Sequence, residues 1–369
     1  MKVCHVTSVH QSTDPRVFQK ECVSLAKAGY ETYLVASGES REDQGVHVIG
    51  VGAPPAGRLK RMTVFSRRVV QAALAVDAEV YHLHDPELLL YAMMLKRKGK
   101  KVIFDSHEYY TLLIRGKYYL KCAGAVTWLY EKFETYVFRR IDAVVTPCTK
   151  DGKDFFEGRT RRTVIVANYA LKSELYDTYV PGGREAPLMC YVGALNEARG
   201  ITNLVRTAEK TGVPLILGGD FQPPAYGDTL REEPGFARVD YRGHADRSQV
   251  RQILQEASIG MNTLLNKGQY NIADTFGVKV YEYMSMGLPI VMSDSAYARR
   301  VKETYDFGIL VDPADVDQIA QAVRYLAEHP EERARMGAEG RRAVAEAFNW
   351  DSQAKVLVDL YRDLIGDPA

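Results

Sequence analysis

Short apolar runs alternate with helical patterns along the whole chain, and this alternation constrains the fold more than any other feature. In the first half, helical patterns lie between the apolar runs, near residues 16–28, 60–76, 87–98, 119–140 and 148–157. After about residue 185 the same scheme repeats. Strands separated by helices indicate βαβ units, in which a mostly parallel sheet is covered on both faces. The predicted fold class is therefore α/β, with doubly wound sheets.

The predicted strands are short and rich in β-branched and aromatic residues. In the first half they are KVCHVTSV, ETYLVAS, VHVIGV, VYHLHD, KVIFDS, AVVTP and TVIVAN. In the second half they are PLMCYVG, PLILGGD, ARVDYRG, SIGMNTLL, LPIVMSD and FGILVD.

The chain of 369 residues is longer than one ordinary core accommodates, so two domains are expected. The segment YVPGGREAP contains proline, a turn at Gly182-Gly183 and no periodicity, which is typical of a linker. We expect domains at 1–180 and 181–349, with a final helix at 350–369 packing back on a domain. Two doubly wound domains leave a cleft bordered by the carboxyl ends of their strands, where ligands bind in such folds.

The composition, with 46% hydrophobic and 26% charged residues, is typical of a soluble globular protein. No apolar run reaches membrane-spanning length, and the polar-punctuated start does not resemble a signal peptide. The cysteines are odd in number, scattered and without a CxxC pair, which argues for a reducing cytoplasm and against a disulfide framework or a structural metal. They are Cys4, Cys22, Cys122, Cys148 and Cys190.

Charge is distributed unevenly along the chain, although its net value is +1. Residues 1–170 carry 26 Lys and Arg against 18 Asp and Glu, and the remainder carries an acidic excess. A basic half suggests that the first domain meets an anionic ligand, and solvated surface charge explains the same asymmetry equally well.

The stretch ADTFGVKVYEYMSMGLPIVMSD leads from a polar loop into a helix and then a strand. Free backbone N–H groups and the positive dipole end make a helix start suitable for phosphate, and Lys279 lies in that first turn. Glu282 lies three residues further on, hence on the same face, where it can accept hydrogen bonds from sugar hydroxyls. A phosphate site and a hydroxyl acceptor one turn apart suggest a sugar nucleotide. The loop before the helix contributes Asp274, Thr275, Phe276 and Gly277.

Other strand ends of the second domain offer further ligand contacts. In YVGALNEARGITNLV, Gly193 ends the strand and Arg199 begins the helix, as a diphosphate clamp requires; a solvent-exposed arginine is the alternative. Gly219 in the GGDF turn lets the backbone approach a ligand closely, or simply turns the chain. His244 follows the next strand and is placed to border the nucleobase.

The first strand of the first domain leads into the loop SVHQSTDPRVFQKE. His10 and Arg16 lie there at a strand end and a helix start, where substrates bind in such folds. Asp14, followed by proline, is typical of a helix N-cap, and we prefer that role to a substrate contact.

Two later loops of the first domain carry histidines. In HLHDPELL, Asp85 is predicted to cap a helix, and a zinc site at His82 and His84 is excluded because no further ligands follow at sensible spacing. In KVIFDSHEYY, His107 and Glu108 follow a strand that should be central. His107 is predicted to hold a sugar hydroxyl or assist proton movement, and Glu108 to contact substrate.

Basic and aromatic residues gather in RLKRMTVFSRR and in the segment from Tyr109 to Arg140. Such segments are suited to an anionic membrane surface or a lipid-phosphate acceptor, whereas aromatic residues at helical spacing are also typical of a core. The second segment carries Tyr109, Tyr110, Arg115, Lys117, Tyr118, Tyr119, Lys121, Trp128, Tyr130, Lys132, Tyr136, Arg139 and Arg140.

With these residues in place, the chain resembles the retaining nucleotide-sugar glycosyltransferases of family 4, which have the GT-B fold of two facing Rossmann-like domains. The resemblance covers nearly the whole length, from SVHQSTDPRVFQKECVSLAKAGYETYLVA through HDPELL, DSHE, VGALNEARGI and FGVKVYEYMSMGLPIV to FNWDSQAKVLVDLY. It implies that Asp274 contacts the donor sugar, Glu282 the ribose, Arg199 the phosphate and His107 the transferred sugar. It also implies that the last helix crosses back to the first domain.

Two positions depart from the family pattern. Asp274 stands where the longer Glu is usual. Ala194 replaces an arginine that commonly follows glycine in the first strand loop of the second domain, and Lys279 is expected to substitute for it.

The sequence thus predicts a cytoplasmic glycosyltransferase that moves a sugar, with retention, from a UDP-linked donor to a glycan, lipid-linked or small-molecule acceptor in cell-surface polysaccharide or glycoconjugate synthesis. No metal and no further cofactor is expected, because cations of the chain neutralise the leaving diphosphate. Peripheral contact with the inner face of an anionic membrane is expected, and a nucleic-acid partner is not. A GT-B-fold sugar-nucleotide epimerase or hydrolase, and a non-catalytic sugar-nucleotide-binding subunit, remain alternatives.

Overall fold

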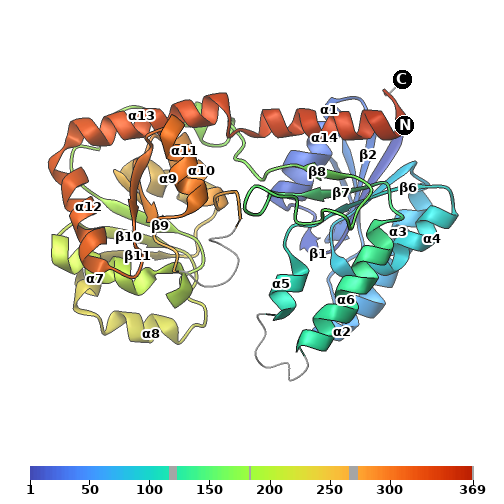
Figure 1. Cartoon of the computed structure of the whole chain (residues 1–369), viewed down its shortest axis with the longest axis horizontal. Helices are drawn as coiled ribbons and strands as arrows, with labels where there is room; N and C mark the ends of the chain where they lie inside the picture. Colours follow the sequence, from blue (N-terminus) through green and yellow to red (C-terminus); the bar gives the residue numbers. More distant parts are fainter. Residues whose placement is uncertain (116–122, 183, 266–272, 368–369) are drawn as a thin grey trace. The chain divides into compact units, whose positions relative to one another are not determined.

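The computed structural model describes residues 1–115, 123–182, 184–265 and 273–367 of the chain (Figure 1). It divides into two compact units, one formed by Met1–Asn168 with Trp350–Ala369 and the other by Tyr169–Asn349. Some residues named in the sequence predictions lie outside the described ranges: Lys117, Tyr118, Tyr119, Lys121, Cys122 and Gly183.

The boundary between the units lies earlier than the predicted residue 180, because the segment that follows Asn168 packs on the second unit. Tyr169, Tyr176 and Tyr179 lie against the apolar cluster of that unit. Aromatic burial therefore places the boundary before the proline and glycine residues that suggested a linker.

The first unit is built on an eight-stranded sheet that is parallel except for the pairing of β3 with β4. Its central strands are buried on both faces, as continuous apolar runs predict. In pairing order the strands are β3 (Arg41–Asp43), β4 (Val46–Gly50), β2 (Glu31–Ser37), β1 (Lys2–Gln11), β5 (Val80–Leu83), β6 (Lys101–Asp105), β7 (Ala143–Thr146) and β8 (Thr163–Ile165).

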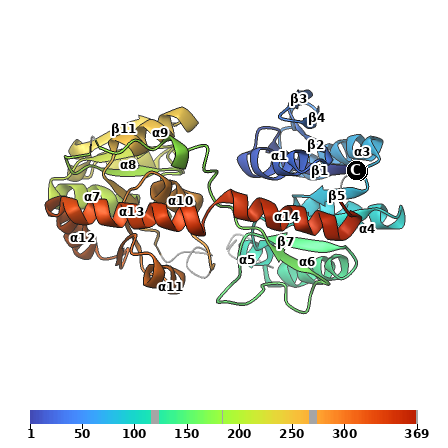
Figure 2. The same ribbon diagram turned by 90° about the horizontal axis from the view of Figure 1, so that it is seen from above.

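The helices of the first unit follow the predicted alternation. They are η1 (Pro15–Cys22), α1 (Val23–Lys27), α2 (Arg58–Lys60), η2 (Arg61–Phe65), α3 (Ser66–Val76), η3 (Pro86–Leu88), α4 (Leu89–Arg97), α5 (Tyr110–Arg115), α6 (Ala123–Phe138) and α14 (Trp350–Ile365). The last of them, α14, lies beside α1 (Figure 2), where the Trp350 indole N–H donates to the Ser24 hydroxyl at 2.9 Å.

The helix predicted at 148–157 is absent, and the described chain there forms turns. Asp151 and Gly152 both adopt the left-handed conformation, with φ values of 49° and 76°. Two successive left-handed residues stop a right-handed helix, so the Asp-Gly pair decides the local structure.

The second unit is built on a six-stranded, fully parallel sheet. In pairing order its strands are β11 (Val239–Gly243), β10 (Leu215–Gly218), β9 (Met189–Val192), β12 (Ile259–Asn262), β13 (Ile290–Ser293) and β14 (Gly308–Val311). The helices of this unit are η4 (Tyr176–Thr178), η5 (Glu197–Arg199), α7 (Ile201–Thr211), α8 (Tyr226–Arg231), η6 (Pro234–Arg238), α9 (Arg247–Glu256), α10 (Val278–Ser285), α11 (Ala296–Thr304), α12 (Val316–Glu328) and α13 (Pro330–Glu346).

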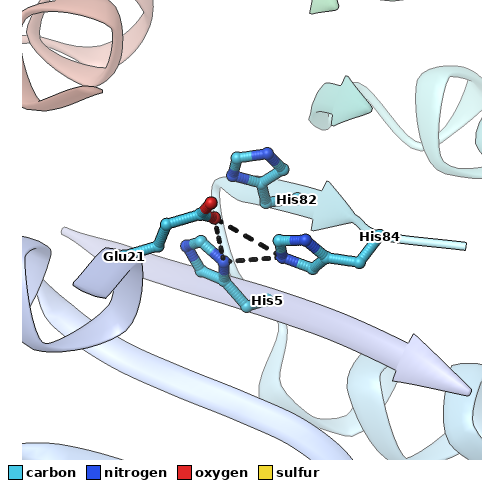
Figure 3. A group of neighbouring side chains, drawn as sticks. All are labelled: His5, Glu21, His82 and His84. Atoms are coloured by element: carbon cyan, nitrogen blue, oxygen red, sulfur yellow. Dashed lines mark hydrogen bonds and ion pairs between the residues drawn. The ribbon is translucent and has the colours of Figure 1, made fainter. Parts of the chain in front are cut away.

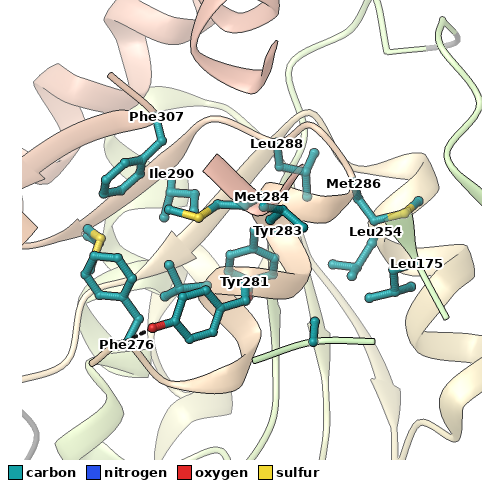
Figure 4. Close-up of a cluster of buried hydrophobic side chains, with 14 of the residues drawn as sticks. Leu175, Leu254, Phe276, Tyr281, Tyr283, Met284, Met286, Leu288, Ile290 and Phe307 are labelled. Atoms are coloured by element: carbon teal, nitrogen blue, oxygen red, sulfur yellow. Dashed lines mark hydrogen bonds between the residues drawn. The ribbon is translucent and has the colours of Figure 1, made fainter. Parts of the chain in front are cut away.

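Helix α10 is anchored in a buried apolar cluster (Figure 4). Tyr281, Tyr283 and Met284 are fully buried there. The Tyr281 hydroxyl accepts the Phe276 N–H at 3.1 Å and lies 3.1 Å from the Thr275 hydroxyl. The core therefore fixes both the helix and the loop that leads into its first turn.

Candidate functional site

The first turn of α10 holds a partly buried cation beside backbone donors that no described side chain caps. Gly277 occupies the N-cap position and no described side chain caps the turn. Lys279 Nζ lies 2.5 Å from the Tyr191 hydroxyl and 3.7 Å from the centre of that ring. Burial, together with the nearby Arg199 guanidinium, holds the pKa of Lys279 well below its usual range. A desolvated ammonium at a helix start is stabilised by an anion.

Glycine is required at the ends of β9 and β10 by close approach. A Cβ at Gly193, where φ is +138°, would lie 2.9 Å from Lys279 Nζ. A Cβ at Gly219, where φ is +136°, would lie 1.9 Å from the Gly193 carbonyl oxygen. The predicted residues Gly193, Gly219 and Lys279 thus come together at the carboxyl ends of adjacent strands.

Arg199 lies directly before α7, at the end of η5. The Asn196 side chain accepts the Arg199 backbone N–H at 3.0 Å, and Gly200 follows in the left-handed conformation with φ of 74°. A Cβ at Gly200 would lie 2.1 Å from the Thr263 carbonyl oxygen, so the chain turns here without a side chain. Because Arg199 lowers the pKa of Lys279, the two cations lie near one another, as a diphosphate site requires.

Glu282 follows Lys279 on α10 and is buried, with its side chain 9% exposed. Its Oε1 accepts from Arg247 Nη1 at 2.8 Å, and Arg247 Nε donates to Glu174 Oε1 at 2.6 Å. Arg247 begins α9 and is oriented by the capping box of Asp246 at that helix start. Glu282, the predicted hydroxyl acceptor, is therefore paired with Arg247, which was not among the predicted site residues.

The residues of the loop before α10 that were predicted to contact a ligand have different surroundings, some polar and some in the core. Asp274 forms an ion pair with Arg300 of α11. The Thr275 hydroxyl lies beside Tyr281, and the Phe276 side chain packs against Tyr281 in the core. A ligand contact of Phe276 is thus restricted to its backbone, because its ring is buried.

His244 follows β11 and is largely exposed, with 79% of its side chain accessible. Its Nδ1 lies 2.9 Å from Asp220 Oδ2, which follows β10. A contact with a nucleobase stays a prediction for this residue.

A cavity of about 710 Å³ opens in the first unit. His10, His107 and Glu108 line one part of it, so three residues predicted separately share one pocket. Most of the other lining residues are apolar, with two arginines among them; they include Arg58, Leu59, Arg61, Met62, Leu90, Leu113, Ile114 and Phe133.

The two histidines of this cavity have opposite electrostatic environments. His10 Nδ1 lies 3.0 Å from Asp14 Oδ2, and although burial opposes it, this hydrogen bond and the Asp85 charge raise the pKa of His10. His107 Nε2 lies 3.0 Å from His84 Nδ1, and burial lowers the pKa of His107 to about 4. His107 is therefore neutral near pH 7, while charge on His10 is favoured.

Arg16 does not line this cavity, and the prediction of a substrate contact for it is wrong. Its side chain is 7% exposed and pairs bidentately with Asp105, with Nε donating to Oδ2 at 3.1 Å and Nη2 donating to Oδ1 at 3.2 Å. It also donates to the Val166 carbonyl at 3.2 Å and lies 3.0 Å from Glu21 Oε1. Arg16 is a buried structural charge, because carboxylates distant in sequence occupy its guanidinium.

The two predicted helix caps have different outcomes. The Asp14 side chain accepts the Arg16 and Val17 N–H groups, both at 2.9 Å, which confirms the predicted cap. The Asp85 carboxylate instead turns toward the end of β1, where it accepts the Ser8 N–H at 2.6 Å and the Thr7 hydroxyl at 2.8 Å. The predicted capping by Asp85 is wrong, because its carboxylate accepts hydrogen bonds from Thr7 and Ser8 and not from the helix that follows it.

The prediction that His82 and His84 lack further possible metal ligands is also wrong. His5 and Glu21 join His82 and His84 in one buried cluster (Figure 3). These residues come from β1, η1, β5 and the loop after β5, so sequence spacing could not reveal them.

Sequence reasoning missed the partners that position the predicted residues. Tyr191, Arg247, Arg300 and His84 contact Lys279, Glu282, Asp274 and His107 respectively. The only sequence signal was the position of Tyr191 and His84 near strand ends, where side chains converge on a ligand site.

Two family models match successive parts of the chain. A glycosyl transferase 4-like domain matches residues 16–168, and a glycosyl transferase-like domain matches residues 199–359. The chain belongs to the glycosyltransferases of family 4 type. The MMP α-(1→4)-mannosyltransferase of Mycolicibacterium hassiacum is similar to this glycosyltransferase, with 34% identity over 45% of the chain and 40% of the relative. The chain spans about half the length of the curated relatives it matches.

Solved structures share the fold of this glycosyltransferase. The sucrose-phosphate synthase of Thermosynechococcus elongatus superposes with a TM-score of 0.77 at 17% identity, covering 99% of each chain. The Anabaena protein HepE, solved in complex with UDP and glucose, superposes with a TM-score of 0.71 at 14% identity, covering 98% of this chain and all of HepE. The predicted GT-B fold of two Rossmann-like domains is confirmed. Within the described ranges, no helix combines the length and apolarity that a bilayer span needs.

Proposed function

We propose that this glycosyltransferase moves a sugar from a UDP-linked donor to a lipid-linked acceptor at the inner face of an anionic membrane, with retention of the anomeric configuration. The observation that carries the proposal is the partly buried, desolvated Lys279 ammonium at the start of α10, held by Tyr191 and near Arg199. A desolvated cation beside uncapped backbone donors is stabilised by an anion, which makes a diphosphate its natural partner.

The second unit binds the donor in this proposal. Lys279, Arg199 and the first turn of α10 hold the diphosphate, and Glu282 accepts hydrogen bonds from the ribose hydroxyls. Asp274 contacts the sugar, with Arg300 orienting its carboxylate. The complex of HepE with UDP and glucose supports a uridine nucleotide as the donor.

The reaction breaks the bond between the anomeric carbon and the diphosphate oxygen. Negative charge then builds on the leaving phosphate, where the fixed cations stabilise it more than in the ground state. The acceptor hydroxyl oxygen bonds to the anomeric carbon on the same face, and its proton passes to the leaving phosphate oxygen. His107 positions the sugar. Because the chain supplies the positive charge, we propose that no metal ion or further cofactor is needed.

The cavity of the first unit holds the acceptor. Its walls are mainly apolar, and its charged lining residues are Arg58, Arg61, Asp85, Glu87 and Glu108, with Arg61 Nη1 2.9 Å from Glu87 Oε1. An apolar pocket with arginines suits a lipid bearing a phosphate better than a purely polar glycan. His10 and Glu108, in the same cavity, would contact the hydroxyl-bearing part of the acceptor.

Exposed apolar side chains on η2, α2 and α6 suit a membrane surface. Leu59, Val64, Trp128 and Leu129 are 76%, 66%, 60% and 65% exposed. Lysines and arginines lie in the same segments, and Lys132 Nζ lies 6.0 Å from the centre of the Trp128 ring. Apolar residues among cations bind the boundary between anionic headgroups and acyl chains.

The donor assignment is tested by a thermal-shift panel of UDP, GDP, UMP and uridine, because a ligand that binds the native state raises the apparent melting temperature. We expect UDP to give the largest shift. Turnover of the UDP-sugar should then require a lipid-linked acceptor. Release of free or epimerised sugar without acceptor would favour the hydrolase or epimerase, and binding without turnover against any acceptor pool would favour a non-catalytic subunit.

The membrane assignment is tested by flotation with vesicles of phosphatidylglycerol and phosphatidylcholine. We expect salt-sensitive binding to the anionic vesicles, weakened by Leu59→Glu and unchanged by Tyr325→Glu, which alters an exposed aromatic residue of the second unit. Equal flotation of the wild type, Leu59→Glu and Tyr325→Glu, or no flotation of the wild type, would contradict the proposed membrane binding.

A further inference from the structure

Buried rings form a continuous hydrogen-bonded chain from the last helix to the cavity of the first unit. The Tyr361 hydroxyl lies 3.0 Å from His5 Nε2, and His5 Nδ1 lies 2.9 Å from His84 Nε2. His84 Nδ1 in turn lies 3.0 Å from His107 Nε2. Figure 3 shows the His5–His84 step with Glu21 beside it. His5, His84 and Tyr361 are fully buried, and His107 lines the cavity.

The uncharged form is favoured for the three histidines of this hydrogen-bonded row, His5, His84 and His107. Burial lowers the pKa of His5 and of His84 well below the usual range, and lowers that of His107 to about 4. A neutral imidazole carries one N–H donor and one bare acceptor nitrogen. Rings linked through both nitrogens must therefore all donate in the same direction along the chain.

The direction is set at the Tyr361 end. There His82 Nδ1 lies 2.9 Å from the Tyr361 hydroxyl, and His82 Nε2 is buried without a hydrogen-bond partner among the described residues. If Tyr361 donates to His82, the unpartnered His82 Nε2 must carry a proton. If His82 donates to Tyr361, that nitrogen is a bare acceptor. Buried N–H groups without partners are rarer than buried acceptors without partners, so the second arrangement is preferred.

In the preferred arrangement, the hydrogen-bond direction at Tyr361 determines which nitrogen carries the proton in every later ring. Tyr361 then donates to His5 Nε2, His5 Nδ1–H donates to His84 Nε2, and His84 Nδ1–H donates to His107 Nε2. His107 is left with its proton on Nδ1, the nitrogen that His84 does not occupy.

We propose that His84, Tyr361 and His5 are positioning residues that hold His107 as the Nδ1–H tautomer, so that His107 donates a hydrogen bond to the transferred sugar and does not act as a base. The sugar contact rests on the proposed function, whereas the tautomer is a property of the unliganded protein. Without the hydrogen bond from His84, we expect His107 to adopt the Nε2–H tautomer. Its Nε2 lies 3.7 Å from the Asp105 carboxylate, which attracts a proton to that nitrogen.

A metal ion bound by the same ring nitrogens is the competing account. Glu21 Oε2 lies 3.7 Å from His5 Nδ1 and 3.9 Å from His84 Nε2, a spacing that resembles a ligand set. The Arg16 guanidinium, however, lies 3.0 Å from the same carboxylate and opposes a second cation in a buried site. The guanidinium, and not a metal ion, therefore supplies the positive charge beside Glu21.

The test is nitrogen-15 NMR of the histidine rings in the full-length protein, with His107 assigned by comparison with His107→Gln. We expect a protonated Nδ1 and a bare Nε2 on His107. In His84→Phe we expect the proton to move to Nε2, toward Asp105, and turnover to fall by about 5- to 30-fold with the UDP dissociation constant unchanged within about twofold. His84→Asn, whose amide can replace the lost donor, should keep the Nδ1–H tautomer and most of the activity.

His47→Phe is the matched control, because His47 is exposed on β4 and pairs with Glu42; it should alter neither the tautomer nor turnover. A wild-type His107 with its proton on Nε2, or an unchanged tautomer in His84→Phe, would overturn the proposal. So would one equivalent of bound metal that is lost with His5→Asn. The NMR measurement needs no substrate. If His107 shows the expected tautomer but the sugar-transfer assay fails, the result would contradict the proposed function and not the proposed role of His84, His5 and Tyr361.

Discussion

Replacing Lys279 by methionine removes the ammonium at the start of α10 while keeping a side chain of similar length. The ammonium is partly buried, lies 2.5 Å from the Tyr191 hydroxyl, and is near the Arg199 charge. A hydrogen bond to a charged group in such a site contributes about 1.5 to 3 kcal/mol. At about 1.4 kcal/mol per tenfold, UDP should bind roughly 10- to 150-fold more weakly to Lys279→Met.

The same substitution should stabilise the protein without ligand. Burial holds the pKa of Lys279 well below its usual range, so the folded state binds this proton less readily than the unfolded state does. Below the usual lysine pKa the charged form therefore weakens folding, and methionine removes that cost. Weaker UDP binding together with a higher melting temperature is the expected result.

Isothermal titration with UDP and thermal unfolding without ligand measure the two effects. Lys302→Met is the control, because Lys302 pairs with Asp306 at the end of α11 and is partly exposed. It should leave UDP affinity unchanged. Unchanged affinity in Lys279→Met would refute the diphosphate clamp, and a lower melting temperature would refute the argument from the buried charge.

Three further substitutions test the packing around the two sites. Gly219→Ala should lower the unfolding free energy by more than about 2 kcal/mol in urea, because its Cβ would meet the Gly193 carbonyl oxygen at 1.9 Å, whereas Gly243→Ala, with open space at its Cβ, should cost about 1 kcal/mol; equal losses would contradict the close approach. Arg16→Met should cost about 3 to 5 kcal/mol, because it leaves buried carboxylates without their cation; a stable variant that binds acceptor poorly would restore the substrate role. Glu21→Gln should become more stable than the wild type as pH rises above about 4.5, because burial, and then a neighbouring carboxylate, raises the pKa of Glu21 well above that value, and a raised folded pKa gives stability that is lost with rising pH; a difference that stays constant from pH 5 to pH 8 would contradict this.

The sheets could be predicted from sequence because their central strands are buried on both faces and consist of apolar runs. β3 was missed because its sequence Arg-Glu-Asp is charged, and it pairs only at the sheet edge. The helix predicted at 148–157 failed because Asp151 and Gly152 adopt left-handed backbone conformations that composition over a window does not weigh.

The site could be predicted only where its residues are close in sequence. Lys279 and Glu282 share a helix face, so their spacing sufficed. Arg16 was assigned wrongly because it lies on η1 and its partner Asp105 ends β6, far away in sequence, so that only the folded structure shows the ion pair. The hydrogen-bonded row of rings through His84 could not be predicted for the same reason, since its members come from β1, the loops after β5 and β6, and the last helix.

The most direct test of the account is acceptor-dependent transfer from an α-linked UDP-sugar to a lipid-linked acceptor, followed by NMR of the anomeric proton in the product. The account predicts one UDP released for each glycoside formed, an α-linkage in the product, and loss of both in Lys279→Met. A β-linked product, or UDP release at the same rate without acceptor, would contradict it.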